Sequence, residues 1–280
     1  EVIDAIRQHL GNANPMVRAA AVQLAGCLAG FVGASGIRAL LADQTPAVLA
    51  VLHAEFAKTR EPTVAKRISA GQVIDSQPSQ GQSQPVQSGQ SQPSQQAKTI
   101  EDLVPRPDLT GPVSSVIPKL GDANWKVRKE ALDELGGLLE KTGRRMALDA
   151  GCAGDLFQAL KARFPDTNRN LAVQALELAG GTAAALGKRN NNRLAMLPVL
   201  PPAMATLADN KPQVRQAALK CLDGLASVLS PAAFWGPAAA ALTASDSPNL
   251  RRDLLIWLTE RVLSVDGDVE DDTSQGALLD

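Results

Sequence analysis

Apolar residues recur at helical spacing along most of the chain, and short polar turns interrupt them. The clearest example begins with a polar turn in which Asp122 or Asn124 can cap the first turn of a helix. The apolar residues that follow have the spacing of one helix face: Val127, Ala131, Leu132 and Leu135. The pattern therefore predicts a helix from Trp125 to Lys141 that packs on a core.

The same sequence motif recurs along the chain: a polar turn followed by an apolar residue and, in most copies, an arginine. The apolar residues that align are Val17, Val127, Leu171, Val214 and Leu250. The last four are separated by 44, 43 and 36 residues, close to the roughly 40 to 47 residues of HEAT-type helical pairs. The sequence therefore predicts an all-α fold, an α-solenoid of HEAT-like helical-pair repeats in which each pair packs on its neighbours.

The same periodicity places the individual helices. After residue 100 the predicted pairs are Val113–Leu120 with Trp125–Lys141, Leu156–Phe164 with Asn168–Leu186, Leu194–Leu207 with Pro212–Leu229, and Ala232–Leu242 with Pro248–Val262. Before it, helices are predicted at Val2–Leu10, Met16–Val32 and Ile37–Leu41, and from Thr45 to Phe56.

A stretch from Ser76 to Gln96 consists almost wholly of Ser, Gln, Pro and Gly, which offers no apolar face to offset chain entropy. We therefore predict two parts joined by a disordered linker, 75–99. Residues 1–74 are expected to be the C-terminal end of one HEAT-repeat domain whose start is missing. Residues 100–264 are expected to be a second domain with about four repeats, and residues 265–280 an acidic disordered tail. A domain that stops there would leave the apolar face of the helix Arg251–Val262 uncovered.

Composition narrows the function classes. The chain has 28 basic and 29 acidic residues and a pI near 6.2, which argues against bulk binding of nucleic acid. Cys27, Cys152 and Cys221 are far apart and lack metal-ligand spacing, so no disulfide framework, metal site or cofactor is predicted, and each is expected to be a small buried apolar residue. No signal peptide and no apolar run that would cross a bilayer are identified, which favours a cytosolic protein without membrane contact.

In a stack of helical pairs the turns within the pairs align along one edge. The turn residues are mainly amides and cations: Asn12, Asn14, Asn124, Trp125, Lys126, Asn168, Arg169, Asn210, Lys211 and Arg251. Such an edge suits a large acidic protein, since Arg and Trp are enriched at interface hot spots and cations steer association. For Arg128 and Arg215, a structural ion pair with an aspartate such as Asp122 or Asp209 is the equally weighted alternative. For Trp125 the alternative is a place in the core.

These residues resemble a known family. The segment Asp122–Glu134 (DANWKVRKEALDE) resembles the first repeat of a TOG domain, found in the microtubule polymerase family of the colonic and hepatic tumour overexpressed protein. The segments Val104–Leu109 and Leu250–Leu258 are similar to the fourth TOG domain of that family, and His9–Arg18 to the end of the third. TOG domains have six repeats, whereas the second part here shows four.

The resemblance implies that the chain binds αβ-tubulin through the turns within its repeats and promotes microtubule growth, at spindle poles and centrosomes in the cytoplasm. By matching position, Trp125 is expected to insert against tubulin. The further tubulin-binding candidates are Lys126, Asn168, Lys211 and Arg215.

Two alternatives from other classes remain. The first is an enzyme, but there is no Walker motif, no GxSxG motif and no metal-ligand spacing. The histidines His9 and His53 are expected to be solvated, and the pairs Gly136-Gly137 and Gly180-Gly181 fit helix packing or caps better than phosphate loops. The second alternative is a HEAT-repeat scaffold for a different protein partner, which a tubulin-binding experiment would distinguish.

Overall fold

The computed structural model describes residues 2–58, 106–188 and 192–264. Within these ranges the regular secondary structure is helical, apart from an isolated bridge between Asp108 and Ala147. The predicted all-α solenoid of helical pairs is confirmed. The predicted linker 75–99, the boundaries 74/75 and 99/100 and the acidic tail 265–280 lie outside the described residues, so this division of the chain stays a prediction.

The helices lie at the predicted places, but their bounds differ by several residues, most clearly for the helix predicted at Leu156–Phe164, which runs from Ala150 to Lys161. Those before the linker are α1 (Val2–Leu10), α2 (Pro15–Val32), α3 (Ala34–Leu40) and α4 (Pro46–Phe56). The next four are α5 (Thr110–Leu120), α6 (Trp125–Lys141), α7 (Ala150–Lys161) and α8 (Arg169–Leu186). The last group is α9 (Arg193–Met196), η2 (Leu197–Val199), α10 (Leu200–Ala205), η3 (Thr206–Ala208), α11 (Pro212–Ala226), α12 (Ala232–Ala244) and α13 (Pro248–Ser264).

One predicted helix, Leu194–Leu207, is broken into the short pieces α9, η2, α10 and η3. The segment contains Pro198, Pro201 and Pro202. Each proline lacks the backbone N–H that a continuous α-helix needs and crowds the preceding turn. The apolar spacing gave the correct position of the element, and the prolines explain why it is not a single helix.

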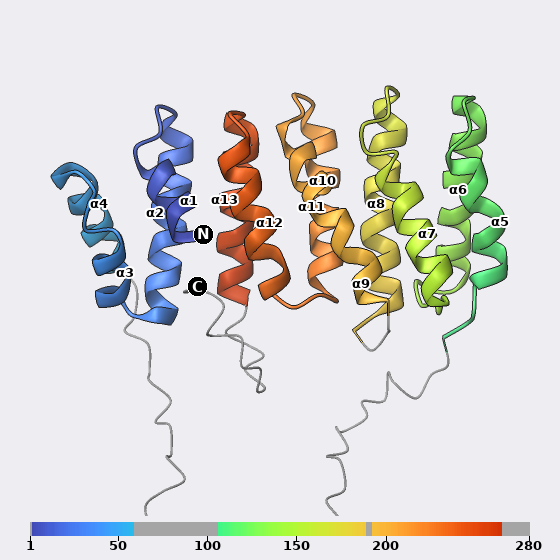
Figure 1. Ribbon diagram of the computed structural model, residues 1–280, viewed down its shortest axis with the longest axis horizontal. Coiled ribbons are helices and arrows are strands. Elements are labelled where there is room, and N and C mark those ends of the chain that lie inside the picture. Colours follow the sequence, from blue (N-terminus) through green and yellow to red (C-terminus); the bar gives the residue numbers. More distant parts are fainter. Residues whose placement is uncertain (1, 59–105, 189–191, 265–280) are drawn as a thin grey trace, which may run out of the picture. The chain divides into compact units, whose positions relative to one another are not determined.

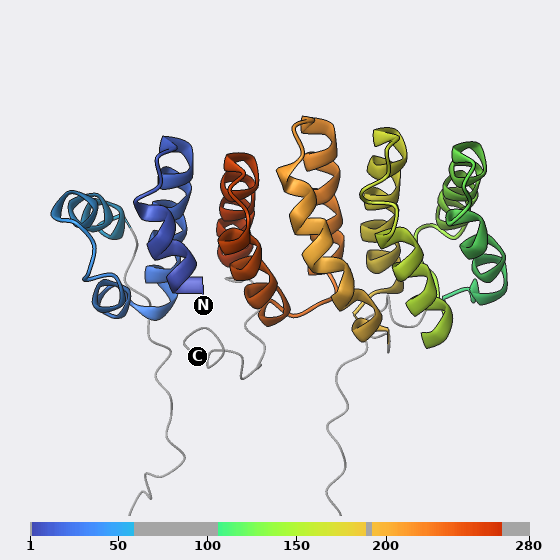
Figure 2. The same cartoon turned by 45° about the horizontal axis from the view of Figure 1, so that its top comes forward.

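The pairs stack side by side in an order that differs from the order along the chain (Figure 1). Helix α6 packs on α8, α8 on α11, and the η3–α10 segment on α13. Helices α1 and α2 then pack on α12 and α13, and α4 packs on α2. The rotated view gives the same order (Figure 2). The first helices of the chain therefore follow the last ones in the stack, and both groups belong to one compact unit.

Helix α13 shows the consequence of this order. Its residues Leu254, Leu255 and Leu258 are at most 1% exposed. The expectation that this face would be left uncovered is wrong, because α2 packs against α13. Trp257 on the same helix is also buried, with its ring 5.4 Å from that of Phe234 and its indole N–H donated to Asp223 at 2.8 Å.

Helix α2 also bears on the membrane prediction. It has 18 residues and a mean hydropathy of 1.4, so by length and composition alone it could cross a bilayer, contrary to expectation. A core helix of a soluble protein passes the same test, and α2 packs on α1, α4 and α13. The apolar character of α2 is accounted for by its neighbours on several sides.

His9 lies at the contact between α1 and α12. It was expected to be solvated, but it is fully buried, with Nε2 3.2 Å from the carbonyl oxygen of Leu242. The expectation of a solvated His9 is wrong because the sequence of α1 shows only an amphipathic helix with a polar C-terminal end. In the structure, α12 packs over that end and buries the histidine. Burial, and then the positive charge of Arg251, lower the pKa of His9, and the hydrogen bond to Leu242 opposes this only in part. The junction is thus built for a neutral imidazole.

We expect this junction to weaken in mild acid. In the unfolded chain His9 takes up a proton below about pH 6.5, while the buried ring resists it. The free energy of unfolding should therefore fall as the pH drops from 7.5 to 5.5. Urea unfolding at several pH values measures this. The decrease should be smaller in His9→Gln and unchanged in His53→Gln, whose side chain is exposed. Equal pH dependence in all three proteins would contradict the assignment.

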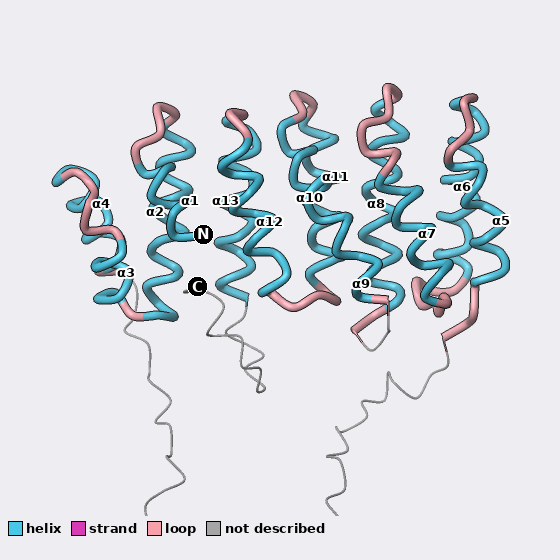
Figure 3. Tube along the Cα trace, in the orientation of Figure 1, coloured by secondary structure: helices cyan, strands magenta, loops and turns pink. Residues whose placement is uncertain are grey.

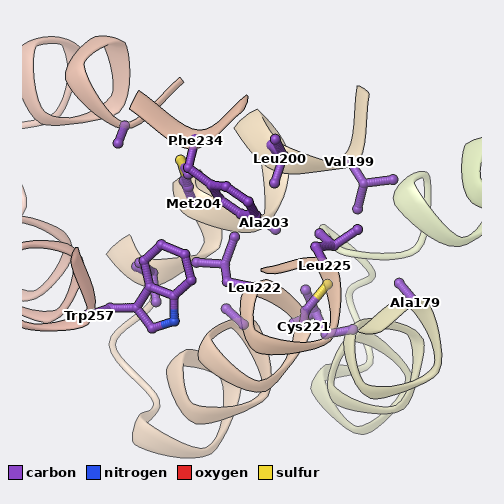
Figure 4. Packing of buried hydrophobic residues seen from close by; sticks show 14 of the residues in the cluster. Ala179, Val199, Leu200, Ala203, Met204, Cys221, Leu222, Leu225, Phe234 and Trp257 are labelled. Carbon is purple, nitrogen blue, oxygen red and sulfur yellow. The ribbon is translucent and has the colours of Figure 1, made fainter. Parts of the chain in front are cut away.

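Helices α8 and α11 cross at very short range through two glycines. A Cβ added to Gly180 would lie 2.7 Å from Cα of Cys221, and one added to Gly224 would lie 2.2 Å from the carbonyl oxygen of Gly180. Figure 4 labels Ala179 and Cys221 at this crossing. Burial raises the pKa of the Cys221 thiol to about 12, so the thiol is neutral. The helix-packing role expected for Gly180 is confirmed, and Cys152 and Cys221 are buried as expected, whereas Cys27 is only partly buried.

Gly180→Ala should therefore destabilise the protein, because the new methyl group meets main-chain atoms that cannot turn away. Overpacking of this kind typically costs about 1–3 kcal/mol. The neighbouring Gly181 is a matched control, since a Cβ there meets nothing within 4 Å. Gly181→Ala should be neutral or stabilising by up to about 1 kcal/mol. Urea denaturation measures both. Equal stability of the two variants would show that the crossing is not tight.

Candidate protein-binding edge

The turns within the helical pairs lie at one edge of the unit, which we call the turn edge (Figure 3). The turns share one local design, in which a side chain accepts from the backbone N–H two residues later. Bonds of this kind join Asn12 to Asn14, Asp122 to Asn124, Asp166 to Asn168, Asp209 to Lys211 and Ser245 to Ser247, at 2.7–3.2 Å. Such turns position the next residue to start a helix.

Asparagine then caps three of the second helices. The side-chain oxygens of Asn14, Asn124 and Asn168 accept from the backbone N–H two residues later, at 2.9, 3.0 and 3.2 Å. Each bond satisfies a donor that the first turn of a helix leaves free. Asn124 was one of the two predicted caps of α6. Asn168, a tubulin-binding candidate, is therefore also the cap of α8.

An arginine one turn into the helix folds back over the turn. Arg128 donates to the carbonyl oxygens of Asp122 and Ala123 at 2.8 and 2.9 Å. Arg215 makes the equivalent bonds to Asp209 and Asn210 at 2.9 and 3.1 Å, and Arg18 bonds Asn12 and Ala13 at 2.6 and 3.0 Å. One guanidinium thus satisfies two main-chain acceptors in each turn and fixes its shape.

The same arginines also link neighbouring pairs. Arg128 Nε lies 2.9 Å from Asp166 of the next turn, and both side chains are nearly buried. Arg215 Nε lies 2.9 Å from Asp253 on α13. The partners suggested from the sequence, Asp122 and Asp209, contribute main-chain carbonyls to these arginines instead of carboxylates. The structural alternative is thus realised for both, with a carboxylate from the following pair.

Other side chains at the turn edge extend into solvent. Trp125 is 48% exposed, so its ring is not part of the core. Lys126 and Lys211 are exposed, and Asn168 is half-buried. Their helix starts belong to three pairs that are consecutive in the stack. Arg215 lies with them, but its side chain is 13% exposed and engaged within the protein.

Sequence reasoning missed one exposed apolar side chain at this edge. Met16 is 57% exposed at the start of α2, at the position equivalent to Lys126. The repeat alignment contained the signal, because Met16 precedes the buried Val17 as Lys126 precedes Val127. Because Met16 is apolar and opens a predicted helix, the sequence predicts that it packs with the helix and does not belong to the exposed edge.

Among the described residues, no group of three or more His, Cys, Asp or Glu side chains could hold a metal ion. The geometry offers a ring, cations and amides on a rigid support, which is suited to binding a protein surface.

Comparisons with known proteins agree with the fold and extend it. The HEAT repeat family model matches residues 199–229, from η2 to the end of the α11 region. Protein MOR1 of Oryza sativa subsp. japonica is 31% identical over 74% of this chain, and centrosomal protein 224 of Dictyostelium discoideum is 30% identical over 94%. Protein mini spindles of Drosophila melanogaster is 26% identical over 93%.

The chain belongs to the TOG-domain family of these proteins. The resemblance stated from residues 122–134 is therefore confirmed. The chain spans 9–13% of the length of these curated relatives. This TOG-domain chain thus corresponds to only a small part of each relative. Similarity alone does not show that it has the activities of the whole relatives.

The Arg128–Asp166 pair gives a test of the turn design. Removing one partner of a buried ion pair typically costs about 3–5 kcal/mol, because the other charge is left buried and uncompensated. Arg128→Ala should therefore lower the free energy of unfolding by this amount. Arg18 holds the equivalent position on α2 but is exposed, so Arg18→Ala should cost only about 1 kcal/mol for its hydrogen bonds. Chemical denaturation measures both; similar losses would contradict the difference in burial.

Proposed function

We propose that this chain is a microtubule-associated TOG module that binds αβ-tubulin through its turn edge. The observation that carries the proposal is Trp125, a half-exposed tryptophan at the first turn of a TOG-family repeat stack. A large ring that the fold leaves in water is costly unless a partner covers it, and tryptophan is the residue most often found as a binding hot spot. The names of two relatives, protein mini spindles and centrosomal protein 224, agree with this role.

The other candidates take different roles in this proposal. Lys126 and Lys211 are exposed cations that steer an acidic surface onto the edge and contact its rim. Asn168 and Arg215 hold their turns in shape and present what remains of their polar surface to the partner. Buried pairs within the stack keep successive turns in register, so the partner meets a preformed surface and little binding free energy is lost to ordering.

The proposed location is the microtubule cytoskeleton, including spindle poles and centrosomes, and the proposed contribution is to microtubule growth. The alternative is a HEAT-repeat scaffold for a different protein. Mixing the purified chain with free tubulin on a sizing column separates the two. Co-elution supports the tubulin proposal, and its absence at micromolar concentration favours the scaffold.

Trp125→Glu is the sharpest test. If the ring serves binding, the variant should keep the melting temperature of the wild type and lose tubulin affinity by at least about 2 kcal/mol, or roughly thirtyfold. Titration of labelled tubulin and thermal unfolding measure the two quantities separately. Val51 is a matched control, since it is 53% exposed on α4, away from the turns. Val51→Glu should leave affinity unchanged.

A second variant distinguishes the anchor from the rim. Lys211→Glu should weaken binding less than Trp125→Glu, and its effect should shrink at high salt because a rim charge acts mainly on encounter. Unchanged tubulin affinity in Trp125→Glu, or unfolding of that variant, would rule out Trp125 as the anchor.

A further inference from the structure

One joint of the stack differs from the others in its polar contacts. It lies between the pair α12–α13 and the pair α1–α2, and we call it the closing joint because it unites helices from opposite ends of the sequence (Figure 1). Its apolar part is complete, since Leu254 on α13 and Leu24 on α2 are fully buried. The difference lies at the turn edge, where arginines connect neighbouring pairs.

At two other joints, an arginine one turn into the second helix reaches a carboxylate of the following pair. Arg128 donates its Nε to Asp166 at 2.9 Å. Arg215 donates its Nε to Asp253 at the same distance. Arg251 holds the same repeat position on α13, directly after the aligned apolar residue. All three side chains are nearly buried, at 11–13% exposed, so a carboxylate is expected next to Arg251 as well.

The pair that follows α13 in the stack does not supply this carboxylate. The turn position that Asp166 holds in its own pair is held by Asn12 in the pair α1–α2, and α2 contains no acidic residue. The buried Nε of Arg251 accordingly has no hydrogen-bond partner. Its Nη2 donates to Asp246 at 2.9 Å, but that carboxylate belongs to the same turn and is fully exposed. Among the described residues, Arg251 therefore forms no ion pair across the closing joint.

A second buried group at the closing joint is also incomplete. His9 on α1 is fully buried, and its Nε2 lies 3.2 Å from the carbonyl oxygen of Leu242 on α12. A carbonyl only accepts, so Nε2 carries the proton, and the buried Nδ1 has no hydrogen-bond partner. Arg251 is close enough to act on the ring electrostatically. A neutral imidazole is tolerated there, whereas an imidazolium places two like charges in a buried site.

The other charged side chains of the helices around His9 are engaged elsewhere. On α1, Arg7 pairs with Asp4 and with Asp43, which follows α3. Arg18 is the one charged residue of α2, and it donates to carbonyl oxygens of its own turn. The sequence of α12 contains no charged residue.

The charges of α13 beyond Arg251 do not compensate it either. Arg252 pairs with Asp253, which also accepts the arginine of the preceding pair. Glu260 and Arg261 follow Arg251 by nine and ten residues, more than two helical turns. Protonation of His9 is therefore opposed by Arg251 without relief from a carboxylate of these helices.

Opening the closing joint relieves both groups. In water the guanidinium and the imidazole gain hydrogen-bond partners, and the imidazole takes up a proton below about pH 6.5. The closed joint binds fewer protons at His9 than the open joint, so it is stable above that pH and weakens as the pH falls through it. Between pH 7.5 and 5.5, one such histidine shifts the equilibrium toward the open joint by about tenfold. The apolar faces of α2 and α13 hold the joint closed at neutral pH.

We propose that the closing joint is an acid-sensitive switch, in which α1–α4 separate from α12–α13 in mild acid while the pairs from α5 to α13 stay folded. In the closed form the turn of the pair α1–α2, with the exposed Met16, extends the turn edge beyond α13. In the open form that turn leaves the edge. The switch therefore sets how many turns a partner meets, and it does not depend on which partner binds there.

Amide hydrogen exchange of the full chain tests the switch, with protection expressed relative to unstructured amides at each pH. At pH 7.5 the amides of α1 and α2 should be at least about tenfold less protected than those of α8 and α11, because α1–α4 lose their cover in the open form without global unfolding. At pH 5.5 the protection of α1 and α2 should be about tenfold lower still. His9→Gln should remove this pH dependence, and His53→Gln, whose side chain is exposed on α4, should keep it.

Asn12→Asp tests the missing carboxylate. Aspartate makes the same turn bond in three other pairs, so the turn accepts the change, and the new carboxylate can pair with Arg251 as Asp166 pairs with Arg128. The protection of α1 and α2 should rise by about tenfold. Ala13→Asp is a matched control, since it adds the same charge at an exposed position of the same turn and should have little effect.

Equal protection of α2 and α8 would overturn the proposal, because the closing joint would then open only when the whole chain unfolds. So would a pH dependence that persists in His9→Gln, or an effect of Asn12→Asp no larger than that of Ala13→Asp.

Discussion

Every helical pair in this protein depends on a neighbouring pair to cover its apolar face, and this constraint governs the whole arrangement. A pair presents leucine and alanine on two sides, and two helices alone cannot bury both. Helices α8 and α11 satisfy the constraint most closely, since Gly180 and Gly224 bring their main chains together. Helix α13 satisfies it through α2, a helix from the other end of the sequence. The order of pairs in the stack is thus set by complementary faces and not by sequence order.

The stacking also explains why the turn edge can hold a rigid binding surface. A turn has main-chain carbonyls that need donors, and in the turns of Arg128 and Arg215 the arginine supplies them while a carboxylate of the next pair neutralises its charge. The turns are therefore completed by their own stack. Side chains that take no part in these turn bonds, such as Trp125 and Lys126, are exposed to solvent on a rigid support. Residues of that kind are available for a partner.

The sequence carried most of the fold because the repeat signal is local. The turn, the cap at Asn124 and the apolar face after it all lie within one stretch of chain, so spacing alone places the helix. The failures concern contacts between distant segments. His9 looked solvated because nothing near it in sequence indicates α12, and the carboxylate partners of Arg128 and Arg215 come from the following pair. Met16 fails in the opposite direction. Its apolar side chain suggests burial, but it is exposed because it lies at the helix start next to the turn.

The two edges of the stack differ in how their charges are used. At the turn edge, Arg128 and Arg215 are consumed in buried or nearly buried pairs, so the remaining cations are few and well placed. At the opposite edge, Arg193 and Lys188 are tied to main-chain carbonyls or left in solvent, and no carboxylate among the described residues neutralises them. Hydrogen bonds to carbonyls fix a guanidinium without cancelling its charge, so an edge built this way keeps its positive potential.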